Sequence, residues 1–318
     1  MTLTQPIRKK PMIGLLAALV LMGCVQSAPT RVVVVPRAQP VAMPVPPASP
    51  SSTSTAAQNY YAQVQQGLLD QGLLRTDGGG VDTPYNDRML AENFLRIAMF
   101  NEYSLSGAGL VAQASSAEMR RWQAPVRVGV NFGASVSLQK RSTDTAQIGS
   151  YLQRLAQVTG HPISLNNNNP NFFIYIVNDD ERRTLAPALT ADLGPQSAAN
   201  IREITAMDQS TYCVVLASTG FNSQAYNRAF VVIRAEHPDL LKLSCIHEEI
   251  AQGLGLPNDS PQARPSIFND DQEFALLTTQ DELMLKMLYN PALRPGMTEA
   301  EARPIVQMLA ARLVGGGS

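Results

Sequence analysis

The feature that most constrains the fold is the run 238–255, which reads PDLLKLSCIHEEIAQGLG. Its apolar residues recur at the spacing of a helix face, so we predict a long helix that starts with this run and ends at Gly253 to Gly255. Glycine favours a helix end because it adopts a left-handed backbone at no steric cost. The later turns of this helix carry the adjacent carboxylates of Glu248 and Glu249. We therefore expect the helix both to pack against a core and to present a polar group.

The segments before this helix alternate between strand and helix patterns. The stretch 124–136, APVRVGVNFGASV, places valine at the alternate positions 126, 128 and 130, which is typical of a strand. The stretch 145–160 predicts a helix that is capped by Thr143 or Asp144 and stopped by Gly160. We expect further strands at 171–179, 210–218 and 228–236. This order predicts an α+β fold, in which a twisted, mostly parallel or mixed sheet packs one face on the two long helices.

Further helices are expected at both ends of this region. Near the C-terminus, one opens at Thr279 with Glu282 three residues on, which is a capping box, and a last one follows. Near the N-terminus, two amphipathic helices are expected, the second capped by Asn86 or Asp87. We expect these two to pair as an N-terminal helical subregion. The boundaries that we predict are 58–103 for this subregion, 104–125 for a linker, 126–315 for the main domain and 298–314 for the last helix.

The N-terminal residues have the pattern of an exported lipoprotein. The basic residues 8–10 precede an apolar run at 11–21 that is too short to span a bilayer. The run ends in LMGC, which resembles the lipobox of bacterial lipoproteins and implies a signal peptide at 1–23 and lipids, palmitate among them, on Cys24. An ordinary signal peptide or an uncleaved anchor is the alternative. Val25, in place of an aspartate, favours the outer membrane over the inner one.

Composition predicts a tether between the lipid anchor and the folded part, and it argues against nucleic acid as a partner. Residues 24–57 are rich in proline and serine and cannot bury a core, so we expect a tether. The signal peptide holds three of the 25 basic residues and none of the 26 acidic ones, which leaves a net charge of about −4. No basic patch interleaved with aromatic residues is present, so nucleic acid is not an expected partner.

Two cysteines, Cys213 and Cys245, remain beyond Cys24. In an exported protein such a pair favours a disulfide, which would join the strand at 210–218 to the long helix. Two separate buried thiols are the alternative.

The eleven residues 248–258, EEIAQGLGLPN, have the layout of the metzincin zinc motif, ligand-base-x-x-ligand-x-x-Gly-x-x-ligand. PSIFND at 265–270 resembles the Met-turn of that family, with Phe268 in the place of methionine, and 277–289 resembles its closing helix. The chain thus resembles a metzincin-like, zincin-type domain with an active-site-type helix over 126–290. By the same segments together with LRPGM, it also resembles an uncharacterised bacterial lipoprotein family, domain of unknown function 2927.

By this resemblance the three ligand positions fall on Glu248, Gln252 and Asn258, and the base position falls on Glu249. Zinc sites use histidine, cysteine and carboxylate ligands, and neutral amides are poor substitutes. Without zinc there is no activated water, so Glu249 has nothing to activate. The resemblance therefore implies a degenerate motif, and we assign no catalytic residue to it.

Three interpretations of this polar cluster stay open. The side chains form a buried hydrogen-bond network, or they hold a hard cation such as calcium, or His247 restores hydrolysis as a ligand or base. His247 faces a different side of the helix from the Glu248–Gln252 pair. The other histidines, His161 and His237, precede prolines, and we expect them at surface or capping positions. The oxygen ligands for a hard cation would be those of Glu248, Gln252, Asn258, Asp259 and Asp270.

These observations predict a lipid-anchored, periplasm-facing protein of the bacterial cell envelope with an inactive metallopeptidase-like domain. We expect it to act in binding or assembly, with an envelope protein or peptide in the cleft. An edge strand beside a cleft pairs with extended peptide, and the expected edge strand is 228–236, with Glu249 lining the groove. The rival functions are an active metallopeptidase of envelope proteins and a cation-stabilised binding domain.

Overall fold

The computed structural model describes residues 49–315, except 107–108, 195–196 and 270. All of these residues belong to the second of two compact units, Pro46–Ser318. The predicted signal peptide, the predicted lipidation site at Cys24 and most of the predicted tether therefore lie outside the described residues. Among the helices that are described, none is long and apolar enough to cross a membrane.

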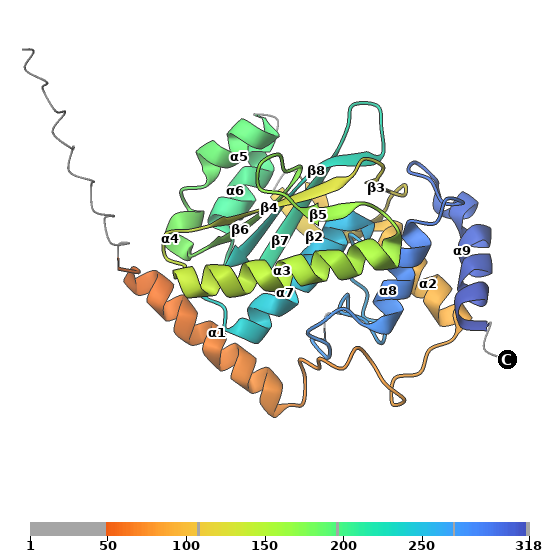
Figure 1. The fold of residues 1–318 in the computed structure, drawn as a ribbon, viewed down its shortest axis with the longest axis horizontal. Helices are drawn as coiled ribbons and strands as arrows, with labels where there is room; N and C mark the ends of the chain where they lie inside the picture. Colours follow the sequence, from red (N-terminus) through yellow and green to blue (C-terminus); the bar gives the residue numbers. More distant parts are fainter. Residues whose placement is uncertain (1–48, 107–108, 195–196, 270, 316–318) are drawn as a thin grey trace, which may run out of the picture. The chain divides into compact units, whose positions relative to one another are not determined.

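A six-stranded mixed sheet forms the centre of the described domain (Figure 1). The strands β5, β4, β6 and β8 lie side by side and are parallel. β7 pairs antiparallel with β8, and the short β3 pairs parallel with the start of β8. This arrangement confirms the predicted α+β fold with a mostly parallel, mixed sheet. The strands are β3 (Arg121–Trp122), β4 (Val126–Phe132), β5 (Ile163–Leu165), β6 (Phe172–Val177), β7 (Cys213–Thr219) and β8 (Ala225–Arg234).

Helices cover both faces of the sheet. Along β8, Val231 and Ile233 join the core that includes α3 and α7, whereas Phe230 and Val232 join the core that includes α5 and α6. Because successive side chains of a strand point to opposite faces, a strand buried on both sides must be apolar throughout. The two long helices lie on the same face, as the sequence predicts. The helices named here are α3 (Leu138–Thr159), α5 (Ala186–Leu193), α6 (Ala198–Ala206) and α7 (Asp239–Gly255).

Two helix starts differ from the prediction. α3 begins at Leu138, where the Ser137 hydroxyl accepts from the Lys140 amide at 3.3 Å, so the prediction of a cap at Thr143 or Asp144 was wrong. The first turns of α3 are polar or exposed, so apolar periodicity starts later than the helix does. Gly160 ends α3 at φ 65°, as predicted. α8 (Thr279–Leu288) is capped one residue earlier than predicted, by a box of Thr278 and Asp281.

The two N-terminal helices do not pair, contrary to the prediction. α1 (Ser52–Asp70), which begins inside the range predicted for the tether, packs beside the short α4 (Asp179–Arg182). α2 (Asp87–Ala98), capped by Asn86, packs against α9 (Glu299–Val314) and lies well away from α1 in Figure 1. The range predicted as a linker contains β3 and most of an antiparallel hairpin. The hairpin strands are β1 (Phe100–Ser106) and β2 (Gly109–Ser116).

A disulfide joins Cys213, the first residue of β7, to Cys245 in the second turn of α7. The predicted bridge is thus confirmed. It ties the edge of the sheet to the helix that carries the polar cluster, and it closes a loop over a sequence separation of 32 residues.

Loss of this disulfide should lower the free energy of unfolding by about 4 kcal/mol, because a cross-link of this loop length restricts the unfolded chain. The measurement is urea unfolding with and without a thiol reductant. The double variant Cys213→Ala/Cys245→Ala should be as unstable as the reduced wild type and insensitive to reductant. Equal midpoints for the oxidised and reduced wild type would contradict this expectation.

Candidate functional site

The C-terminal end of α7 is held by side chains from distant segments. Gly255, the last residue of the helix, has φ 130°, a backbone conformation that favours glycine. The indole Nε1 of Trp122 donates to the Gly253 carbonyl at 2.9 Å, and the Tyr289 hydroxyl donates to the Leu254 carbonyl at 2.9 Å. The carbonyls that a helix end leaves without intrahelical partners are satisfied in this way. The helix therefore stops where the sequence predicts, at Gly253 to Gly255.

Close packing on the sheet sets the position of the polar turns of α7. A Cβ atom placed on Gly253 would lie 2.7 Å from the Phe172 ring of β6 and 3.2 Å from Val215 of β7. Only glycine permits this approach without a shift of the ring. Because the helix lies so near to β7, Glu249 and Gln252 face the edge of the sheet.

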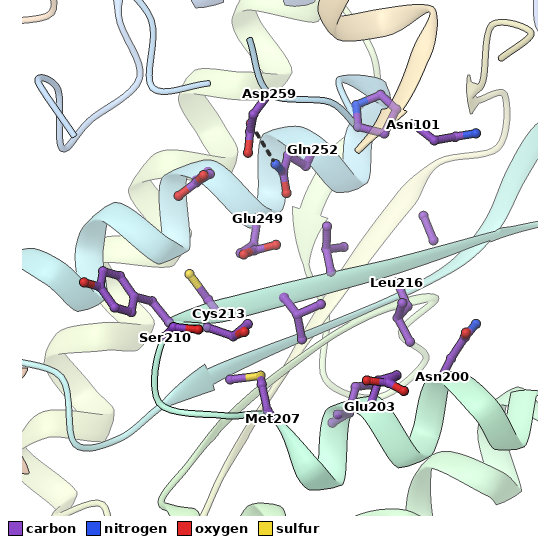
Figure 2. Close-up of a pocket in the computed structure, with 18 of the residues that line it drawn as sticks. Asn101, Asn200, Glu203, Met207, Ser210, Cys213, Leu216, Glu249, Gln252 and Asp259 are labelled. Atoms are coloured by element: carbon purple, nitrogen blue, oxygen red, sulfur yellow. Dashed lines mark hydrogen bonds between the residues drawn. The ribbon is translucent and has the colours of Figure 1, made fainter. Parts of the chain in front are cut away.

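The sequence places four residues at the positions of a zinc motif, and the structure brings only part of them together (Figure 2). Glu248, Glu249 and Gln252 line a common cleft, with Glu249 and Gln252 each 5% exposed. The Gln252 amide donates to Asp259 Oδ1 at 3.2 Å. Asn258 is directed elsewhere: its Nδ2 donates at 2.9 Å to the carbonyl of Arg96 in α2.

His247 lies outside the cleft and packs in the core. Its ring stacks on Tyr151 of α3 with centroids 3.9 Å apart, and its Nδ1 accepts from the Leu277 amide at 3.2 Å. Burial lowers the pKa of His247 to about 3, with a smaller effect from the Arg154 charge, so the ring is neutral near pH 7. A neutral imidazole that is held against α3 is not placed to act as a ligand or base in the cleft.

The segment that resembles a Met-turn is tied to the start of α8. Phe268 is fully buried, and the Ser266 hydroxyl donates to Asp281 Oδ1 at 2.6 Å. The amides of Ile267 and Thr278 donate to Asp281 Oδ2 at 3.0 and 2.9 Å. Burial raises the pKa of Asp281 to about 6 despite these hydrogen bonds. The described residues of this segment, 265–269, are not among those that line the cleft.

The cleft has a volume of about 760 Å³ and runs along β7. One side is formed by α7 through Glu248, Glu249 and Gln252, and the other side by α6 and the loop 207–212. Figure 2 shows Glu249 and Gln252 from α7 facing the strand that carries Cys213 and Leu216, with Glu203 on the far side. In the described part of the chain, β7 pairs with β8 only, so its other edge bears no strand.

The residues of the motif do not fit a zinc ion. Gln252 and Asn258 offer neutral amides, and Asn258 is bound to the end of α2 instead of facing Glu248. Among the described residues, no group of three or more histidine, cysteine, aspartate or glutamate side chains is suited to a metal ion. The candidate cation ligand Asp270 lies outside those residues. The donor set of this site therefore does not support zinc chemistry.

Sequence reasoning assigned the wrong strand to the cleft. β8, the strand predicted at 228–236, is internal and pairs with β3, β6 and β7, whereas β7 forms the edge. The prediction also missed the acidic residues Glu203 and Asp208, and it missed Arg120, the one basic residue among the described residues of the lining. These residues come from three separate segments, and no spacing in the sequence links them. His237, for which a surface or capping position was predicted, is not at the surface: it is 2% exposed, and its Nε2 lies 2.9 Å from the Tyr212 carbonyl.

The fold and cleft define a mixed α/β domain with a polar groove beside an antiparallel edge strand. The family described as Protein of unknown function (DUF2927) matches residues 87–308. Because this match covers more than half of the chain, the protein belongs to that family. Comparison with curated proteins gives no match, and comparison with solved structures gives none either.

Gly253→Ala should destabilise the fold by about 1–3 kcal/mol, because the added methyl group overlaps Phe172 and Val215 in a packed core. Gly149→Ala in α3 is the matched control, since nothing lies within 4 Å of a Cβ there, and it should be neutral or stabilising. Thermal or urea unfolding of both variants measures the difference. Equal stabilities would show that α7 does not depend on this close approach.

Acid should destabilise the fold through its buried histidines. Burial lowers the folded-state pKa of both His237 and His247 to about 3, against 6.5 in the unfolded chain. The stability that the two buried neutral rings contribute is fully present above pH 6.5. As the pH falls toward 3, the unfolded chain takes up protons that the folded protein does not, and the free energy of unfolding falls by up to about 1.4 kcal/mol per pH unit for each ring. Asp281, whose pKa is raised to about 6, opposes this loss between pH 6 and 3.8.

The test is urea unfolding at a series of pH values, with His247→Gln as the comparison. The variant should lose stability less steeply between pH 6.5 and 4 than the wild type. Identical slopes for the two proteins would contradict the buried, neutral state of His247.

Proposed function

We propose that the protein is a lipid-anchored binding module of the bacterial cell envelope that holds an extended, basic peptide segment against β7 without hydrolysing it. The observation that carries the proposal is the open edge of β7 inside an acidic cleft beside α7. The domain is metzincin-like in this proposal. A mixed sheet, an antiparallel edge strand and the following helix with Gly255 at the motif position support that interpretation.

A strand edge binds extended peptide through main-chain hydrogen bonds. The outer edge of β7 presents backbone donors and acceptors that pair with another strand in the mode called β-augmentation. Five consecutive residues of β7, 213–217, line the cleft. The disulfide and the tight contact at Gly253 fix this strand relative to α7, which reduces the ordering cost of binding.

Charge selects the kind of peptide. Among the described residues of the lining, five are acidic and one, Arg120, is basic, which gives these residues a formal charge of −4. Successive side chains of an extended peptide point to opposite sides, and both sides here carry acid, Glu203 on α6 and Glu248 on α7. Lysine or arginine side chains of a bound strand therefore meet opposite charge on either side, which favours encounter and register.

The proposal does not include hydrolysis, because two of the three zinc-ligand positions of the motif carry side chains that are poor ligands for zinc. The positions that would hold zinc carry a carboxylate and two amides, and Asn258 faces α2. The envelope location is supported by the lipobox-like LMGC sequence and the proline-rich residues that follow it.

Binding is tested with the mature chain carrying Cys24→Ser, by fluorescence anisotropy of labelled peptides in which alanine alternates with lysine, glutamine or glutamate. The lysine peptide should bind tightest, and its affinity should fall with added salt. Glu203→Gln/Glu248→Gln should weaken it several-fold, whereas Asp87→Asn, a charge loss on α2, should not. Absence of binding by all three peptides would overturn the proposal.

Metal content and cleavage separate this proposal from its rivals. The purified chain should hold no stoichiometric zinc by elemental analysis, and Glu249→Gln should leave the peptides as intact as the wild type does. One zinc per chain together with cleavage that is lost in Glu249→Gln would establish the metallopeptidase. A melting temperature that falls with chelator and returns with calcium would establish the cation-stabilised domain.

A further inference from the structure

A second cavity, of about 450 Å³, lies away from the cleft at the carboxyl ends of three parallel strands. Its lining comes from the segments that follow β4, β6 and β8, among them Ser135, Asn178 and Glu236. One face of α1 covers it through Ser54, Gln58 and related positions. Open α/β sheets bind ligands in the crevice outside the carboxyl ends of their strands.

Three buried side chains in this lining each have an atom without a hydrogen-bond partner. The atoms are Glu236 Oε2, Asp144 Oδ2 and His237 Nδ1. Their residues are 5%, 2% and 2% exposed, so the side chains are more than nine-tenths buried. Leaving a buried polar atom without a partner costs free energy. Three such atoms around one cavity therefore point to a missing donor.

The rest of each side chain is firmly held. Glu236 Oε1 accepts from the Ser54 hydroxyl and the Asp179 amide, both at 2.7 Å. Asp144 Oδ1 lies 2.8 Å from Lys242 Nζ. His237 Nε2 lies 2.9 Å from the Tyr212 carbonyl, which only accepts, so Nε2 carries the hydrogen and Nδ1 is an acceptor. Burial lowers the pKa of His237 to about 3, which keeps the ring in this neutral form.

All three open atoms are thus acceptors, and they define the ligand chemistry. Among the described residues of the lining, both lysines already pair with acids, Lys242 with Asp144 and Lys140 with Asp239, so neither ammonium group is open to an anion. The described residues provide no cluster of metal-binding side chains. A positively charged group with several N–H donors matches two carboxylates and an imidazole nitrogen.

We propose that this cavity binds a small primary amine, whose ammonium group donates to Glu236 and Asp144 beneath α1. The site is separate from the peptide cleft, and its occupancy does not depend on peptide binding. Because Ser54 on α1 shares Glu236 with the ligand, binding also fastens α1 to the sheet.

The test is isothermal titration of the mature Cys24→Ser chain with putrescine, and with 1,4-butanediol as the uncharged control of the same length. Putrescine should bind saturably and butanediol should not. Glu236→Gln should weaken putrescine binding about tenfold or more, since it removes a charge-assisted hydrogen bond. Gln58→Trp, which fills the exposed mouth and leaves the buried network intact, should weaken it as well.

Both variants are compared with wild type by circular dichroism, so that loss of folding is recognised. If Glu236→Gln unfolds, putrescine binding by Gln58→Trp decides the test. Absence of saturable putrescine binding by the wild type, unchanged binding in Gln58→Trp, or a crystal soak that shows ordered water alone at the three acceptors would overturn the proposal.

Discussion

The structure depends on how α7 is held against the sheet. Near its start, the disulfide from Cys245 ties the helix to β7, and near its end Gly253 lets the helix touch Phe172 on β6. Trp122 and Tyr289 then satisfy the last carbonyls. These contacts leave little freedom for the helix to move relative to the edge strand. The geometry of the cleft, and the direction in which Glu249 and Gln252 face, follow from this fixed position.

Much of the fold was predictable because it follows from local signals. Alternating or continuous apolar runs predicted the strands. Glycine predicted the helix ends at Gly160 and Gly255, and both residues have a positive φ in the structure. Cap positions were less predictable, because Thr278 and Thr279 are equally good caps by residue type and only the observed hydrogen bonds decide between them. The pairing of α2 with α9 was not predictable, since the two helices lie at opposite ends of the sequence.

The site was predictable only in part, for a related reason. The motif spacing located Glu248, Glu249 and Gln252 on one helix, and the cysteines indicated which strand lies beside it. The sequence did not show that β8 is internal, because runs 210–218 and 228–236 are both apolar and sheet order depends on distant pairings. Likewise, Asn258 occupies a ligand position by spacing, yet the carbonyl of Arg96 satisfies its side chain.

Hydrogen–deuterium exchange on the mature Cys24→Ser chain tests the central claim, that the outer edge of β7 receives an extended basic strand. The amides of Cys213–Thr219 should gain protection when the lysine-alternating peptide is added, and those of β5 at the opposite edge should not. If the peptide binds and the exchange of β7 stays unchanged, the bound segment lies elsewhere, and the account of the cleft is contradicted.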